Sequence, residues 1–273
     1  MKNKFTLRLI LFICFSSIVF TSCTEEIELD LKSVTSQLVI EVNITNSSGP
    51  YFAKFSKSQP YYESSSFQKI TPEWVVITDE SGVFDTLKEV EPGLYKTDSS
   101  FMGIVGRSYR FQAKVEGRLY ESLCRMPNIV QIDTLVVSES SGGGFGGGQG
   151  GEGKLVTCVF HDPSGIENFY LIRASVNGEL IKDFVVVNDR LKDGKLFEQN
   201  LRQVRFQKGD IITIQLISIS QEVYEYYNLL NQNSFGSPIA GSVAPANPPT
   251  NITPETLGCF SAQSEVSKTL IVQ

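Results

Sequence analysis

The chain is poor in the residues that most enzymes use for chemistry. Among its 273 residues stand one histidine, His161, and one tryptophan. No two cysteines have a CxxC spacing, and neither a nucleophile-elbow pentapeptide nor a loop with EF-hand spacing is present. A lone histidine is more often a surface residue than a ligand or base, so serine hydrolases and the common zinc and calcium sites have no support. We therefore expect no enzyme, with no catalytic residues, no metal and no cofactor.

Carboxylates are numerous in the sequence and can act as catalytic groups. Asp and Glu total 30 against 24 for Lys and Arg, which gives a net charge of −6. This acidic balance disfavours nucleic acid as a partner. Asp79, Asp85 and Asp133 could meet in space as the pair of acids that hydrolyses a glycosidic bond. The alternative, which we favour, is that these acids solvate the surface.

The amino end has the layout of a lipoprotein signal peptide. An apolar run over residues 9–20 follows three basic residues, Lys2, Lys4 and Arg8. The run is shorter than the ~20 apolar residues that a transmembrane helix needs. Small residues then lead to Cys23, so we expect cleavage before Cys23 and attachment of lipid, including palmitate, to its thiol. The alternative is an ordinary secretory signal. No second apolar run of spanning length follows, so the acyl chains would hold the protein on the membrane.

Alternating hydrophobicity divides the rest of the chain into short strands. Apolar residues occupy every second position over residues 38–44 and 109–115, which is typical of strands with one buried face. Turn residues separate about seven such segments, as in an immunoglobulin-like sandwich, before a break at residues 126–128. We expect a mainly β protein with a signal peptide over residues 1–22, a lipidated flexible tether over 23–36, an amino-terminal immunoglobulin-like β-sandwich over 37–126, and a second antiparallel β domain carrying one helix over 127–273.

Several connections in the second β domain can be predicted from their residue types. Residues 142–153 are mostly glycine, and strand-like residues follow them where a nucleotide-binding loop would need a helix. We therefore predict a flexible excursion between two strands. Asn177-Gly178 predicts a tight hairpin, because both positions of such a turn need positive φ. Residues 201–206 and 211–220 predict another hairpin, and residues 260–272 predict a closing strand.

One helix stands out over residues 221–233. Ser220 can cap its first turn, and Glu222 suits the positive end of the helix dipole. Apolar residues at helical spacing indicate packing against a sheet. Tyrosine is enriched at interfaces and function concentrates on loops, so the helix and the proline-rich loop over 237–253 also form our candidate binding surface. The candidate residues of this surface are Tyr224, Tyr226, Tyr227 and Phe235.

Cysteines and threonines suggest two covalent features. Once Cys23 carries lipid, Cys124, Cys158 and Cys259 remain, and an odd number cannot all pair internally. We favour three separate buried thiols, with one disulfide as the alternative. Thr86 and Thr134 each lie between an aspartate and a leucine, which resembles the acceptor motif of Bacteroidota O-glycosylation. Both threonines are therefore candidate glycosylation sites.

An ordered set of short motifs along the mature chain resembles a known lipoprotein family. The motifs are TEEIELDL after Cys23, LVIE at 38–41, ITN at 44–46, GPY at 49–51, PGLY at 92–95, GRSY at 106–109, FHDP at 160–163, NFY at 168–170, ANPPTNI at 246–252 and LGCFSA at 257–262. Together they resemble the Bacteroidota outer-membrane lipoprotein family called domain of unknown function 4249.

The resemblance implies a location, a partner and an architecture. It implies an outer-membrane lipoprotein, often encoded beside a TonB-dependent receptor, with an immunoglobulin-like domain before a second β domain. Glu25 and Glu26 resemble the acidic signal that sends such lipoproteins to the outer face. The resemblance transfers no catalytic residues. The expected function is a non-catalytic binding or accessory module of a TonB-dependent transport system. The alternatives are a surface hydrolase of glycans or peptides and a structural or adhesion lipoprotein.

Overall fold

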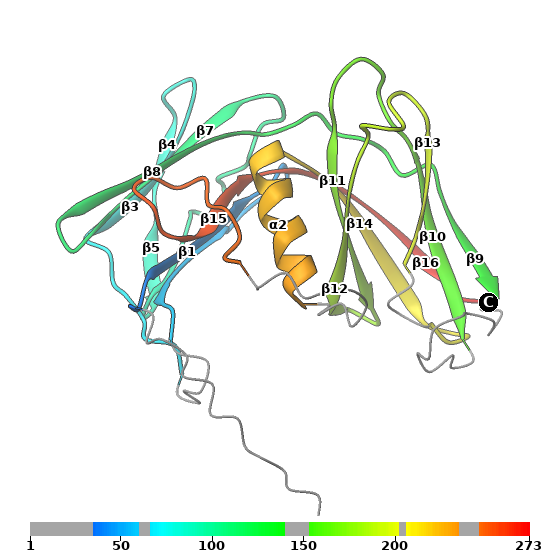
Figure 1. Cartoon of the computed structure of the whole chain (residues 1–273), viewed down its shortest axis with the longest axis horizontal. Coiled ribbons are helices and arrows are strands. Elements are labelled where there is room, and N and C mark those ends of the chain that lie inside the picture. Colours follow the sequence, from blue (N-terminus) through cyan, green and yellow to red (C-terminus); the bar gives the residue numbers. More distant parts are fainter. Residues whose placement is uncertain (1–34, 60–65, 140–152, 202–205, 235–245) are drawn as a thin grey trace, which may run out of the picture. The chain divides into compact units, whose positions relative to one another are not determined.

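The computed structural model of the chain describes residues 35–59, 66–139, 153–201, 206–234 and 246–273. Ser36–Gln273 form one compact unit, in which the described residues build four β-sheets and the helix α2 (Figure 1). The mainly β class predicted from the sequence is confirmed. None of the helices in this described part of the chain is long and apolar enough to span a membrane.

The first two sheets face each other as a sandwich. One sheet has the strand order β15-β1-β2-β6-β5 and the other has the order β4-β3-β7-β8. Their strands are β1 (Leu38–Ile44), β2 (Phe52–Lys57), β3 (Trp74–Asp79), β4 (Phe84–Thr86), β5 (Lys88–Glu91), β6 (Leu94–Lys96), β7 (Ser108–Val115), β8 (Arg118–Arg125) and β15 (Leu257–Ala262). The predicted immunoglobulin-like sandwich is confirmed as a two-sheet structure.

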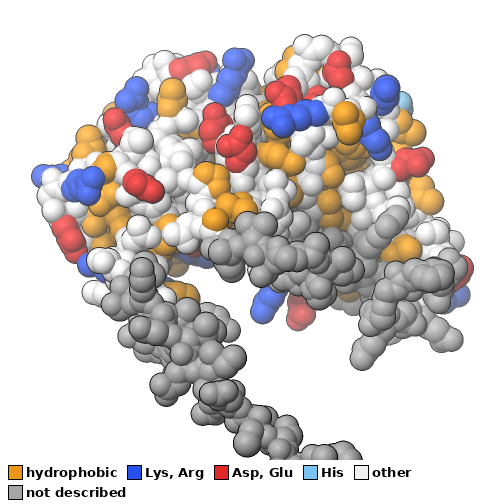
Figure 2. Space-filling view, in the orientation of Figure 1, with side chains coloured by type: hydrophobic (Ala, Val, Ile, Leu, Met, Phe, Trp, Pro, Cys, Tyr) orange, Lys and Arg blue, Asp and Glu red, His pale blue; other side chains and the backbone are white. Residues whose placement is uncertain are grey.

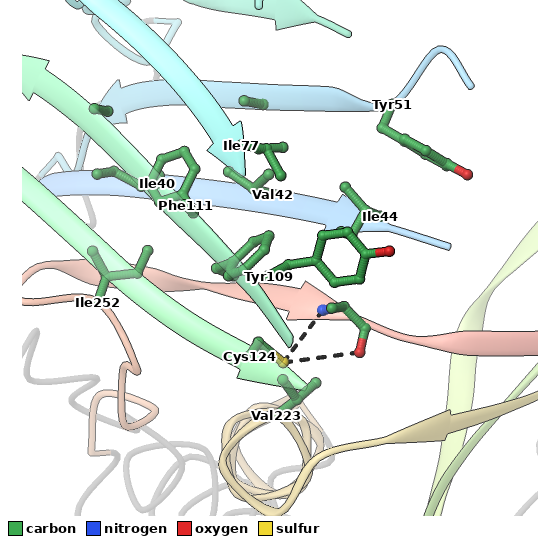
Figure 3. Packing of buried hydrophobic residues seen from close by; sticks show 14 of the residues in the cluster. Ile40, Val42, Ile44, Tyr51, Ile77, Tyr109, Phe111, Cys124, Val223 and Ile252 are labelled. Carbon is green, nitrogen blue, oxygen red and sulfur yellow. Dashed lines mark hydrogen bonds between the residues drawn. The ribbon is translucent and has the colours of Figure 1, made fainter. Parts of the chain in front are cut away.

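The core of this first sandwich follows from the period-two pattern of its strands. Ile40, Val42 and Ile44 are almost completely buried and face the side of Tyr109 and Phe111 from the opposite sheet (Figure 3). The Phe111 ring stacks on Phe260 at a centroid distance of 5.6 Å. Each such side chain contributes about 1.5–3 kcal/mol of hydrophobic stabilisation when it is fully buried. Burial of alternate side chains therefore determines which face of β1 looks inward.

The predicted closing strand over 260–272 is wrong in part, because this segment contains two strands that belong to different sheets. β15 pairs in parallel with β1 in the first sheet, whereas β16 (Ser264–Ile271) pairs antiparallel with β14 (Ile211–Ile219). The run therefore divides at Gln263, whose backbone N–H donates a 3.0 Å hydrogen bond to the backbone carbonyl of Ile44. Residues 257–262, predicted to lie in the second β domain, belong instead to the first sheet. A one-dimensional pattern shows that a segment is a strand but does not show its partner.

Two asparagines attach this segment by mimicking a strand backbone. The Asn251 side chain donates to the Phe260 carbonyl at 2.7 Å and accepts from the Phe260 amide at 2.9 Å. The Asn46 side chain makes the same pair of bonds with the backbone of Glu265, at 3.2 and 2.6 Å. Each amide side chain thus satisfies backbone groups that lack a neighbouring strand at that position.

The other two sheets form a second sandwich, with strand orders β13-β10-β9 and β12-β11-β14-β16. The predicted second β domain is thus built of antiparallel sheets. Its remaining strands are β9 (Thr134–Glu139), β10 (Lys154–His161), β11 (Phe169–Val176), β12 (Glu179–Asn188) and β13 (Leu196–Asn200). Phe160 is fully buried between the rings of Phe197 and Tyr170, at centroid distances of 5.0 and 4.9 Å.

The connections of this sandwich test three predictions. Asn177 and Gly178 have φ of 52° and 88° and join β11 to β12, which confirms the tight hairpin. Residues 202–205 of the predicted hairpin of 201–206 with 211–220 lie outside the described residues. The described ends contradict the hairpin, because Leu201 and Phe206 bond to Val156 and Lys154 of β10, whereas β14 pairs with β11 and β16. The turn before β14 crosses from one sheet to the other. The glycine-rich excursion lies largely outside the described residues, and β9 and β10 on either side of it pair antiparallel.

Helix α2 (Gln221–Ser234) confirms the predicted helix over 221–233 and lies between strands of the two sandwiches (Figure 1). The Ser220 hydroxyl accepts from the Val223 amide at 3.5 Å, as a cap does. Val223 and Tyr227 are buried in the core of the first sandwich, together with Phe169 and Leu171 of β11. One continuous core therefore joins the first sandwich, the helix and one sheet of the second sandwich.

Candidate functional site

The structure separates the candidate tyrosines of α2 by their contacts. Tyr227 is buried, whereas Tyr224 and Tyr226 are half-buried. The Tyr224 hydroxyl accepts a 2.8 Å hydrogen bond from Asn188 Nδ2, and its ring centroid lies 5.1 Å from that of Phe169. Tyr224 therefore packs against the β11–β12 sheet. Tyr226 and Tyr227 instead line a pocket between the helix, the β11–β12 hairpin and the first sheet.

This pocket, which we call the α2 pocket, has a volume of about 340 Å³. Its floor is the outer face of the first sheet, where Glu41 of β1 pairs in register with Lys54 of β2 and Cys259 of β15. Helix α2 covers Cys259, which is 5% exposed, but leaves Glu41 and Lys54 exposed. The helix and the β11–β12 hairpin supply the walls. The volume lies within the range of about 300–1,000 Å³ typical of small-molecule sites.

Arg173 of β11 is held in the α2 pocket by an aromatic side chain. Its Nη2 atom donates to the Tyr227 hydroxyl at 3.1 Å, and its Cζ atom lies 5.5 Å from the centroid of the same ring. Phe184 packs edge-on against the Tyr227 ring at 5.4 Å. Among the described residues, no ion pair with a carboxylate within 4.0 Å involves Arg173. The tyrosine therefore orients the guanidinium without neutralising its charge.

The charge of the α2 pocket is opposite to that of the whole chain. Its described lining contains Arg173, Lys54 and Lys182 but one acid, Glu41. The chain as a whole carries a net charge of −6. On the face seen in Figure 2, acidic and basic side chains are interspersed without a large field of one sign. The positive excess is thus a local property of the pocket.

Asn43 lines the same pocket, and its amide oxygen is buried beneath the pocket surface. The Oδ1 atom has no hydrogen-bond partner, and the side chain lines both the α2 pocket and an adjoining pocket of about 480 Å³. The adjoining pocket shares Glu41 and Lys54 and extends to Phe52 and Leu94. A buried acceptor without a donor costs about 1–3 kcal/mol.

Burial keeps two lining groups, Tyr226 and Cys259, neutral. It raises the pKa of the Tyr226 hydroxyl and that of the Cys259 thiol, with smaller contributions from the nearby negative groups. Cys124 and Cys158 are also free and buried, and burial raises the pKa of Cys158 to about 12. The three described cysteines are therefore separate protonated thiols, as favoured from the sequence, and not nucleophiles.

Two of the three candidate acids line a different pocket, of about 440 Å³, in the first sandwich. Asp79 and Asp85 are joined there by Asp98. Asp79 Oδ2 accepts from Arg107 Nη1 at 2.6 Å, and Asp85 Oδ2 accepts the Asp98 amide at 2.6 Å. The third acid, Asp133, lies in the second sandwich before β9 and does not line this pocket.

Hydrogen bonds keep two acids of this pocket, Asp79 and Asp98, ionised. Burial opposes the charge of Asp79, but hydrogen bonds from Ser81, Arg107 and the following turn outweigh it and lower the pKa of Asp79. The backbone amide and the hydroxyl of Ser100 lower the pKa of Asp98. A glycosidase needs one carboxyl group that stays protonated as the general acid. These two carboxylates therefore stabilise turns and are unsuited to that role.

We expect Asp79→Asn to lower the free energy of unfolding by about 2 kcal/mol at pH 7, because hydrogen bonds to charged groups contribute roughly 1.5–3 kcal/mol. Since the folded-state pKa of Asp79 is lowered, its stabilisation is present above the ordinary value of 3.8. It is lost as pH falls through the folded-state pKa. Urea unfolding at pH 7 and about pH 3 should therefore show a difference from the wild type that shrinks in acid.

A matched control for this charge effect is Glu91→Gln, at an exposed position of β5. Its unfolding midpoint should equal that of the wild type at both pH values. If the effect of Asp79→Asn were as large in acid as at neutral pH, altered packing rather than lost charge would explain it.

One group of three carboxylates in the described residues could hold a metal ion. Oxygens of Asp162, Asp189 and Asp193 lie within 4.8 Å of one another. Asp162 accepts hydrogen bonds from the Tyr170 hydroxyl at 2.5 Å and the Gly194 amide at 2.9 Å. The other two carboxylates each accept a backbone amide at 2.8 Å. These bonds connect the loops that follow β10 and β12, so we assign the group a structural role and no ion.

The remaining candidate residues lie apart from the α2 pocket or outside the described residues. His161 is exposed, and its Nδ1 atom lies 2.5 Å from Asp133 Oδ2. Thr86 and Thr134 are exposed, and their glycosylation stays a prediction. Cys23 and Phe235 lie outside the described residues.

Sequence reasoning identified Tyr226 and Tyr227 but missed the charged and polar lining of the pocket. One local signal could have found Arg173. On β11, Phe169 and Leu171 of the same face are buried in the core beneath α2, and Arg173 continues that face with a charge. A cation on an otherwise apolar strand face marks a place where the core ends or a partner is needed. Asn43 and Glu41 have no such signal, because they look like outward residues of an alternating strand.

The fold and the site define a class of protein: a mainly β protein of two packed sandwiches with a basic pocket beside a single described helix. A family model described as "Domain of unknown function (DUF4249)" matches residues 24–269. The chain belongs to this family, as the sequence motifs predicted.

Neither solved structures nor curated proteins add a function to the family assignment. A segment of two fibronectin type III domains from chicken tenascin is similar to the chain at 11% sequence identity and a TM-score of 0.24, covering 87% of this chain and 99% of that one. No curated protein matches the chain.

Proposed function

We propose that this protein is an outer-membrane lipoprotein, held at the cell surface by acyl chains on Cys23. In this proposal it acts as a non-catalytic binding module of a TonB-dependent transport system. The α2 pocket is its ligand site, and the transporter is its partner. The neutral buried thiol of Cys259 in the lining of the α2 pocket supports binding rather than chemistry there, and the separate pocket of Asp79 and Asp98 has carboxylates that are engaged in hydrogen bonds.

The order of segments around Cys23 is the observation that carries the proposal. A basic start and an apolar run lead to Cys23, the family match begins at residue 24, and the compact unit begins at Ser36. This order suits a lipid anchor, a spacer and a binding body. A buried methylene contributes about 0.8 kcal/mol to membrane binding, and more than one acyl chain is needed for a stable hold.

Cys23→Ala should abolish the incorporation of labelled palmitate, because the thiol is the attachment point. The protein should then accumulate as uncleaved precursor or leave the outer-membrane fraction. Cys14→Ala is a matched control, since it removes a thiol from the apolar run that is expected to be cleaved away. It should leave labelling unchanged. Normal labelling of the Cys23→Ala protein would contradict the anchor.

Copurification tests the partner. The tagged full chain is isolated from its own outer membrane in mild detergent, and the bound proteins are identified by mass spectrometry. We expect a TonB-dependent receptor to be enriched with the wild type and depleted with Cys23→Ala, which cannot be held in the same membrane. An abundant protein without any receptor, under conditions that preserve known receptor complexes, would count against the transport role and favour an adhesive or structural one.

A further inference from the structure

The α2 pocket combines an anchored cation with a half-buried aromatic ring. We infer that it binds a small hydroxylated carboxylate, such as a uronic acid, with Arg173 holding the carboxylate and Tyr226 packing against the sugar ring. This inference deepens the proposed function and rests on its claim that the α2 pocket is the ligand site. It names the chemical class of the ligand, which neither the fold nor the family specifies.

The guanidinium of Arg173 is oriented by Tyr227 and has N–H donors available for an anion. A guanidinium has five N–H donors, and the described contacts of Arg173 use one of them, in the 3.1 Å bond to Tyr227. The ring of Tyr227, fixed by Phe184, limits the rotamers of the arginine before any ligand arrives. A carboxylate matches the remaining planar donors with two parallel hydrogen bonds. Less conformational entropy is then lost on binding than with a freely moving side chain.

The surrounding charges favour a ligand with a net negative charge. Lys54 and Lys182 line the same pocket and add to the positive potential, against the single acid Glu41. A phosphate group is less suited to this wall, because phosphate sites commonly use a helix amino terminus or a nest of backbone amides. The residues of α2 that line the pocket lie on its central turns, from Tyr226 to Leu230, and not at its amino terminus.

The aromatic wall and the polar floor account for the sugar ring. Tyr227 is buried, whereas the half-buried Tyr226 lies edge to face against it at a centroid distance of 5.3 Å and lines the pocket. The Tyr226 ring can pack against the apolar C–H face of a sugar. Exposed Glu41 and Lys54 on the floor of the pocket can bond the hydroxyl groups of the sugar. An acidic sugar therefore fits the ring, the floor and the cation at once.

Isothermal titration calorimetry on the full chain in mild detergent tests the inference. The probes are glucuronate and galacturonate, with their neutral counterparts glucose and galactose, and inorganic phosphate. We expect saturable binding of at least one uronate, with neutral sugars at least about tenfold weaker, as the loss of a charge-assisted pair implies. Arg173→Gln should weaken uronate binding at least about tenfold. Lys208→Gln removes the same charge from an exposed turn outside the pocket and should change nothing.

Each alternative outcome overturns the inference in a defined way. Equal binding of uronate and neutral sugar, or unchanged uronate binding by Arg173→Gln, would remove the carboxylate from the proposal. Tighter binding of phosphate than of either uronate would assign the pocket to another anion, and no saturable binding of any uronate would refute the ligand class. If Arg173→Gln does not fold, Lys182→Glu reverses an exposed charge of the same pocket and should weaken uronate binding severalfold. Lipid labelling and receptor copurification do not depend on these results, so the two proposals can fail separately.

Discussion

Gly258→Ala should lower the free energy of unfolding by roughly 3 kcal/mol or more, which is a large loss for the addition of one methyl group. Gly258 has a φ of +89°, and a Cβ atom at this position would lie 2.1 Å from the Ile40 carbonyl oxygen of β1. The neighbour in the way is backbone, which cannot rotate aside. The added methyl group should therefore push β15 away from β1 and break the parallel pairing from Val39 to Ile44. The midpoint of urea unfolding measures the loss.

Gly82→Ala separates this clash from simple backbone strain. Gly82 has a φ of +87°, nearly that of Gly258, but no atom lies within 4 Å of the position its Cβ would take. It should therefore show the left-handed strain alone, about 1–2 kcal/mol. If both variants lost the same stability, the close approach of β15 to β1 would not be a feature of the folded protein in solution.

Phe160→Ala should lower the free energy of unfolding by about 3–5 kcal/mol, the range for removal of a buried aromatic ring. The Phe160 ring is fully buried and stacks on Phe197 in the core of the second sandwich. We also expect this substitution to destabilise the first sandwich. The reason is that β15 and β16 are consecutive strands in different sandwiches, and the core beneath α2 includes residues of β11. The two sandwiches should then unfold in one cooperative transition.

The lone tryptophan makes this coupling measurable. Trp74 lies in β3 of the first sandwich, so its fluorescence reports that sandwich, whereas far-ultraviolet circular dichroism reports all strands. For Phe160→Ala both signals should shift to the same lower urea midpoint. Leu191→Ala, at a position that is 92% exposed, should shift neither. A tryptophan transition that stays at the wild-type midpoint while circular dichroism becomes biphasic would show that the sandwiches unfold independently.

Most local elements could be predicted because their signals lie within a few neighbouring residues. The alternation in β1 and β7, the Asn177-Gly178 turn and the Ser220 cap each act over less than one element. Errors arose where a correct strand needed a distant partner. The apolar run at the carboxy terminus predicts one strand where the structure has two. The described ends of the segment 201–206 bond to β10 and not to β14, the predicted hairpin partner. Periodicity contains no information about pairing.

The candidate site shows the same division. Tyr226 and Tyr227 could be identified from helical spacing and residue type. Arg173 and Asn43 could not be connected with them, because β11, β1 and α2 are far apart in the sequence and meet only when β15 returns to the first sheet.

By itself, the sequence determined the mainly β class, the position of the helix, the motif at Cys23 and the family, because periodicity, caps and short motifs are local properties. Only the tertiary structure decided that the carboxy-terminal run divides at Gln263 between two sandwiches. It also decided that a basic pocket forms where α2 leaves the outer face of the first sheet uncovered. The physical reason is that burial and charge compensation depend on which distant surfaces meet, and a linear pattern does not specify those meetings.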